Sequence, residues 1–80
     1  MLYTVTVFDK KDKKFNTYRH VQSINYGDDL SRHGEITTVS GDEMLTHRFD
    51  LRYDMHLVFA DQRNVVISST LIVSLDITQE

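Results

Sequence analysis

The chain has 80 residues, a formal net charge of -3, and neither cysteine, proline nor tryptophan. This length allows one small domain, and the lack of cysteine excludes disulfide bonds, a thiolate nucleophile and cysteine-ligated zinc. The acidic balance argues against a general nucleic-acid-binding protein, which is usually basic. We therefore expect residues 1–80 to form a single domain held together by apolar packing or by a partner chain.

Membrane insertion and secretion are not predicted. No apolar run approaches the roughly 18 residues of a membrane span. The first nine residues lack the basic and then apolar pattern of a signal peptide. We expect a cytoplasmic protein with no membrane partner.

The composition favours strands. Val, Ile and Thr together number 21 and Phe and Tyr add eight, whereas Ala occurs once, at Ala60. β-branched and aromatic residues suit pleated structure, and Ala is the strongest helix former. The predicted fold class is all-β: a small antiparallel barrel or a two-layer sandwich of six to seven short strands, with at most one helical turn.

The first elements alternate between strands and polar turns. Apolar residues alternate with threonines over residues 3–7, which predicts a strand with one apolar face. The polar run 9–14 predicts a hairpin connection to a second strand over 15–20. Residues 21–26 predict a short strand that is entered through a bend and ends at Gly27.

Turn chemistry dominates the next part of the chain. Asp28 or Asp29 can cap a single helical turn over residues 30–32. Residues 35–39 predict another strand. The loop 40–43 has the length and composition of a four-residue hairpin connection, so a further strand is expected to follow it.

The most regular alternation runs from Leu45 to Phe59, where odd positions are mainly apolar and even positions mainly polar. A straight strand of this length would extend roughly 46 Å, too long for so small a domain. We expect it to bend through a bulge near residues 52–54, or to break there into two strands of the same phase. A long bent strand is typical of small barrels and orthogonal sandwiches.

The last elements are predicted to be a turn over 60–64, a strand over 65–67, a bend over 68–70 and a final strand over 71–77. The final strand should place its odd-numbered apolar residues on one face. The predicted core consists of Tyr3, Val5, Val7, Ile24, Ile36, Phe49, Leu51, Met55, Leu57, Phe59, Ile67, Val73 and Leu75.

A row of alternating charges is the first candidate site. Arg48, Asp50, Arg52, Asp54 and His56 would lie about 6.6 Å apart on one face of a regular strand. Such a face could bind a polar partner. The alternative is a solvated sheet face whose salt bridges only fix the strand register.

A basic loop is the second candidate site. It contains Lys10, Lys11, Lys13 and Lys14, which give residues 10–14 a charge of +3. With Phe15, Tyr18 and Tyr26 nearby, this loop could meet the phosphates and bases of a nucleic acid. The alternative is a soluble hairpin tip whose charges protect a neighbouring apolar strand from aggregation.

The run from Val65 to Leu75 contains no charged residue and has high strand propensity. If its edge were exposed, it would recruit other strands. It must therefore be central in the sheet or covered by another chain. The candidate self-association strand contains Leu71, Ile72, Val73 and Leu75.

Metal and cofactor sites are not predicted. The four histidines, His20, His33, His47 and His56, form no His-x-His or His-x-x-x-His pair. His47 is in phase with neighbouring apolar residues, so we expect it to be partly buried with a hydrogen-bond partner. No serine lies in a nucleophile elbow and no glycine-rich loop is present, so we expect neither enzymatic activity nor a cofactor.

The sequence therefore predicts a small non-enzymatic protein-interaction or assembly module that binds a protein partner, which can be a second copy of itself. The alternative is a nucleic-acid-binding barrel of OB or SH3 shape that uses the loop from Lys10 to Lys14. In composition the chain resembles the short, proline-poor, threonine-rich β proteins carried by bacteria and their prophages. This resemblance implies a role in assembly or in inhibition of a host protein.

Overall fold

The computed structural model describes residues 1–27 and 36–80. These residues form six strands, one short helix and one 3₁₀ turn. In chain order they are β1 (Tyr3–Asp9), β2 (Lys14–Gly27), β3 (Ile36–Ser40), α1 (Glu43–Thr46), β4 (Met55–Phe59), β5 (Asn64–Ile67), η1 (Ser69–Leu71) and β6 (Ile72–Gln79). The predicted helical turn over residues 30–32 and His33 lie outside the described residues.

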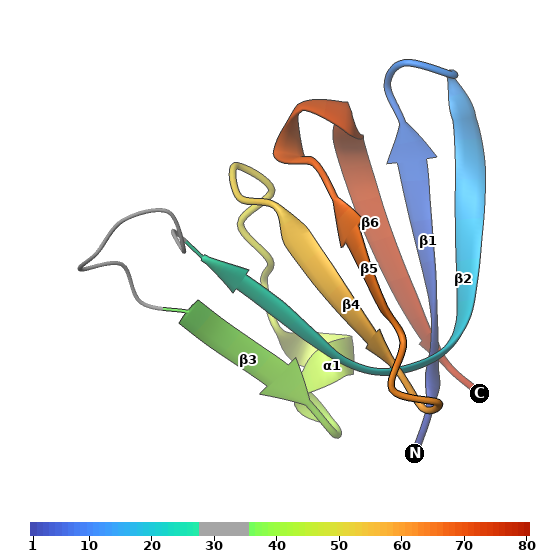
Figure 1. The fold of residues 1–80 in the computed structure, drawn as a ribbon, viewed down its shortest axis with the longest axis vertical. Helices are drawn as coiled ribbons and strands as arrows, with labels where there is room; N and C mark the ends of the chain where they lie inside the picture. The colour runs from blue at the N-terminus through green and yellow to red at the C-terminus, as the bar shows by residue number, and fades with distance from the viewer. Residues whose placement is uncertain (28–35) are drawn as a thin grey trace.

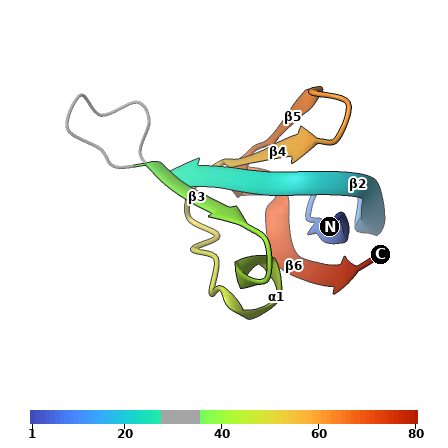
Figure 2. The same cartoon turned by 90° about the horizontal axis from the view of Figure 1, so that it is seen from below.

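The strands form one antiparallel sheet with the order β5-β4-β2-β1-β6, and β3 also pairs with β2 (Figure 1). The predicted all-β fold class is confirmed. The strands belong to one continuous sheet that curves around its own interior, as the view in Figure 2 shows. This curvature replaces the second layer of a sandwich.

The bend in β2 gives the sheet its curvature. The first half of β2 pairs with β1, whereas residues 23–26 lie between β3 and β4. His20 has a positive φ of 64°, and the pairing with β1 shifts register beside it. Val21 pairs with Tyr3 on one side and with Phe59 on the other. The predicted bend before residue 21 is therefore confirmed, but within a single strand.

The carboxylate of Glu80 holds this bend from outside. It accepts a hydrogen bond from the backbone N–H of His20 at 2.6 Å and another from the Thr4 hydroxyl at 2.9 Å. His20 Nδ1 lies 2.8 Å from the other oxygen of the Glu80 side chain. These contacts, the His20 N–H first, lower the pKa of Glu80. The end of the chain is thus tied to the point where β2 changes direction.

The core lies on the concave side of the sheet. Its buried residues are Tyr3, Val5, Val7, Val21, Ile24, Val39, Met44, Met55, Leu57, Phe59, Ile67 and Ile72. Eight of the predicted core residues are among them. Phe49, Leu51 and Leu75, also predicted, are partly buried and pack against this core.

Two predicted core residues are wrong. Ile36 is 58 % exposed and Val73 is 53 % exposed. Ile36 and Val39 lie three positions apart in β3, so only one can face inward, and Val39 does. Val73 is the extra residue of a bulge, because Ser74 pairs with Phe8 and Ile72 pairs with Asp9. The bulge buries Ile72 and turns Val73 outward.

The prediction of a strand from residue 44 or 45 onward is also wrong. Residues 43–46 form α1, residues 47–54 are irregular with a turn over 51–53, and regular pairing begins only at Met55. Met44 is 1 % exposed and anchors α1 to the core, whereas Leu45 is 46 % exposed. Figure 2 shows α1 after the end of β3 and alongside β6.

Candidate functional site

The predicted polar face does not exist as a row on one strand. Arg48, Asp50, Arg52 and Asp54 lie in the irregular segment, and only His56 lies on a strand, on the outer side of β4. The alternating charged residues therefore do not lie together on one face of a β-strand. Whether any of these side chains binds a partner stays a prediction.

Two of these carboxylates instead organise the backbone. Asp50 Oδ2 lies 2.7 Å from Arg52 Nη2, and Asp50 Oδ1 accepts the backbone N–H of Arg52 at 3.1 Å. The side-chain and backbone hydrogen bonds from Arg52 lower the pKa of Asp50 to about 2. Asp54 accepts the backbone N–H of Ser69 at 2.8 Å, which ties the irregular segment to η1.

An aromatic cluster packs the same segment against β2. The rings of His47, Phe49 and Tyr53 surround Tyr26, with centroids 5.6, 5.6 and 6.3 Å from its own. The hydroxyl of Tyr26 lies 2.6 Å from His47 Nε2. The prediction that His47 is partly buried with a hydrogen-bond partner is confirmed.

The remaining histidines of the described residues are His20 on β2 and His56 on β4. His20 is exposed at the bend of β2 and contacts Glu80. Residues 1–27 and 36–80 contain no group of three or more His, Cys, Asp or Glu side chains able to hold a metal ion. The expectation that the protein binds no metal or cofactor stays a prediction.

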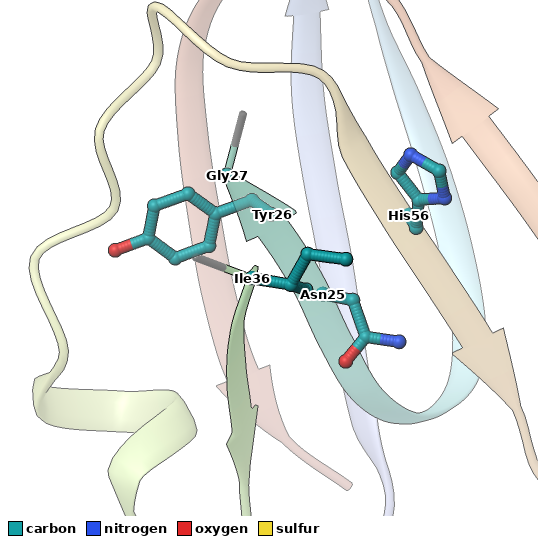
Figure 3. A pocket seen from close by; sticks show the side chains of 5 residues that line it. All are labelled: Asn25, Tyr26, Gly27, Ile36 and His56. Carbon is teal, nitrogen blue, oxygen red and sulfur yellow. The ribbon is translucent and has the colours of Figure 1, made fainter. Parts of the chain in front are cut away.

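A hollow of about 120 Å³ lies on the outer side of the sheet between β2, β3 and β4 (Figure 3). It is lined by Asn25, Tyr26, Gly27, Ile36 and His56. Asn25 and His56 are register partners on neighbouring strands. Among the residues that the structure describes, the buried Oδ1 atom of Asn25 has no hydrogen-bond partner. Sequence reasoning did not single out Asn25, because a lone amide in a strand carries no pattern.

The basic loop is a hairpin tip, as predicted. Residues 10–13 connect β1 to β2, and Lys10, Lys11, Lys13 and Lys14 are all exposed. The neighbouring aromatic residues differ in their exposure to solvent. Phe15 is 62 % exposed, whereas Tyr18 and Tyr26 are partly buried and pack against the core. Of the three rings predicted as a platform, only Phe15 is available at the tip.

The predicted self-association strand lies at an edge of the sheet. Leu71 belongs to η1, and Ile72, Val73 and Leu75 belong to β6. Among the described strands β6 pairs only with β1, so no described strand pairs with its second edge, although α1 and the segment after it lie against β6. Of the two alternatives, a central position is therefore excluded within the described residues. An open edge covered by another chain stays a prediction.

A hollow of about 220 Å³ borders β6. Its lining comes from α1 and the segment after it, and from β6: Met44, Leu45, His47, Phe49, Leu75, Asp76 and Ile77. The sequence did not indicate this hollow, because residues 44–49 were expected to form a strand. The packing of a short helix beside an edge strand can be recognised only in the tertiary structure.

Comparison with family models, curated proteins and solved structures found no match to this chain. Within the described ranges, no helix is both long and apolar enough to cross a membrane.

Proposed function

We propose that the protein is a non-enzymatic assembly module that binds another polypeptide by adding a strand to the second edge of β6. The observation that carries this proposal is the combination of edge position and composition. β6 has eight residues, of which only Asp76 is charged, and the described part of the chain pairs it on one side only. Strands of this kind bind other strands.

The backbone groups available for this pairing follow from the ladder with β1. The N–H of Glu80 donates to the C=O of Leu2 at 3.0 Å. Hydrogen-bonded pairs alternate along an antiparallel ladder, so Thr78 and Asp76 direct their backbone groups to β1. Leu75 and Ile77 then direct theirs to the second edge. No described strand pairs with these groups, and α1 lies beside them across the hollow that Leu75, Asp76 and Ile77 border.

The partner in this proposal is a second copy of the chain, because the edge is complementary to itself about a two-fold axis. An antiparallel alignment that places Leu75 opposite Leu75 also places Val73 opposite Ile77 and Asp76 opposite Ser74. The neighbouring alignment would place Asp76 opposite Asp76, where like charges are destabilising. Asp76 thereby disfavours the alignment centred on itself, whereas the closed, symmetric pairing centred on Leu75 has no like charges opposite one another. We also propose that the protein is cytoplasmic, which is compatible with its lack of cysteine.

Sedimentation equilibrium at tens of micromolar tests the proposal. The monomer has a mass of 9.4 kDa, and we expect a mass near twice that value. Val73→Lys places a charge at the open edge and should shift the equilibrium to the monomer. Val66→Lys is the matched control, because Val66 is 56 % exposed and lies on β5, at the other end of the sheet.

A wild-type chain that stays monomeric in this experiment would contradict the proposal. So would a dimer that Val66→Lys dissociates and Val73→Lys leaves intact, since pairing would then involve another edge.

A further inference from the structure

The tip of the β1–β2 hairpin is held in a fixed backbone conformation. Asp9 Oδ1 accepts the backbone N–H groups of Lys11 and Asp12 at 2.8 and 3.1 Å. The N–H of Lys13 donates to the C=O of Asp9, and the N–H of Lys10 donates to the C=O of Leu71, both at 2.8 Å. The tip is thus tied to η1 as well as to its own strands. A fixed backbone reduces the entropy lost when the side chains bind a ligand.

The positive charge of the protein is concentrated at this tip. Residues 10–14 carry +3 in a chain of net charge -3, which leaves -6 on the other 75 residues. The four lysines are exposed, and within residues 1–27 and 36–80 none of them forms an ion pair. With Asp9 included the tip still carries +2, so it presents net positive charge at one end of the molecule. Such a patch attracts an anionic ligand.

An exposed aromatic ring adjoins the lysines. Phe15 follows Lys14 directly and is 62 % exposed. Its ring meets that of Phe8, its register partner on β1, edge to face at a centroid distance of 4.8 Å. Phe8 supports Phe15 from one side and leaves much of its surface in water. A ring beside clustered lysines offers stacking for a base and charges for phosphates.

We infer that the hairpin tip binds single-stranded nucleic acid, with the four lysines contacting backbone phosphates and an unstacked base lying on Phe15. A single strand is favoured over a duplex because its bases are free to stack on a side chain. This site is separate from the open edge of β6 and does not depend on dimerisation. Binding is sequence-tolerant, since every base has an aromatic face.

Fluorescence polarisation with a labelled oligothymidylate of about 12 nucleotides tests the inference. If four lysines contact phosphates, the logarithm of the association constant falls with the logarithm of salt concentration with a slope of about -3. This slope corresponds to a loss of affinity of about 50-fold between roughly 50 and 200 mM salt. The matched probe is an abasic strand of the same length, which retains the phosphates and lacks the bases. We expect it to bind about tenfold more weakly, because stacking on Phe15 is lost.

Two pairs of substitutions separate the tip from overall charge. Lys11→Glu with Lys13→Glu should abolish binding at the lower salt concentration. Arg48→Glu with Arg52→Glu changes the net charge by the same amount on the irregular segment and should reduce affinity much less. Phe15→Ala should bind the oligothymidylate and the abasic strand with equal affinity, and circular dichroism checks that each variant is folded.

Absence of oligothymidylate binding at the lower salt concentration would overturn the inference. Equal loss in the two double variants would do the same, since the effect would then reflect net charge alone. Equal affinity of the wild-type protein for the oligothymidylate and the abasic strand would reject the role of Phe15 and with it the preference for nucleic acid. Binding to phosphatidylserine vesicles without binding to the oligonucleotide would assign the tip to a membrane surface instead.

Discussion

Asp50 and Arg52 form a local ion pair that fixes the turn in the irregular segment, and its effect on acidity is measurable. Hydrogen bonds from Arg52 hold the pKa of Asp50 at about 2, below the ordinary value of 3.8. A lowered pKa in the folded state stabilises the fold above the unfolded-state pKa. This contribution is lost as the pH falls from about 4 toward 2. We expect an NMR titration of the Asp50 carboxyl carbon to give a midpoint near 2.

Arg52→Gln is the control for this titration. Without the guanidinium group the midpoint of Asp50 should move up toward 3.8. An unchanged midpoint in the variant would show that Arg52 is not the cause of the lowered pKa. A wild-type midpoint near 3.8 would show that the ion pair does not persist in solution.

The hydrogen bond between Tyr26 and His47 connects β2 to the irregular segment, and its removal should destabilise the protein. Tyr26→Phe deletes the hydroxyl and leaves the ring in the aromatic cluster. We expect the free energy of unfolding in urea to fall by about 1 kcal/mol. Tyr18→Phe is the matched control, because among the described residues the Tyr18 hydroxyl has no hydrogen-bond partner. Equal effects of the two substitutions would argue against a specific bond at His47.

At the level of elements, the sequence predicted most strands and failed between residues 44 and 54. Alternation correctly indicated β1, the two halves of β2, β4, β5 and the final strand. The same alternation continues through residues 45–54, where no strand forms. There the chain is held by contacts with distant residues, including Tyr26 on β2 and the backbone of Ser69. A local period of two cannot report such contacts, because it registers only spacing along the chain.

Substitutions at Met44 and Leu45 test whether the chain forms α1 or the predicted strand at this point. A strand beginning at Leu45 with its odd positions inside would bury Leu45, whereas α1 buries Met44. Met44→Ala should therefore lower the free energy of unfolding by about 2–5 kcal/mol. Leu45→Ala should cost about 1 kcal/mol or less, since Leu45 is 46 % exposed. Urea denaturation of the two variants measures the difference, and the reverse order would favour the strand.

At the level of the whole molecule, strand order is the feature that the sequence did not predict. Each strand was recognised from its own residues, but the placement of β1 between β2 and β6 joins segments about 70 residues apart. The two candidate surfaces likewise differ in how well the sequence predicted them. The lysine tip was predictable because a turn and its charges are local. The open edge of β6 was predicted only as one of two alternatives, since edge or centre depends on the global arrangement.

β2 is flanked by neighbours along its inner half, with β1 and β4 at Val21 and β3 and β4 at Ser23 and Ile24. Exposing the backbone amides of these residues to solvent requires several strands to separate at once. A local fluctuation therefore cannot expose them. Their amide protons should exchange with deuterium only when the entire chain opens, and should be among the slowest in the protein. The amides of β5, a four-residue strand with one neighbour among the described strands, should exchange orders of magnitude sooner. Mass spectrometry or NMR would resolve the two classes of amide. Similar exchange rates in both would mean that the inner half of β2 is not more protected than β5.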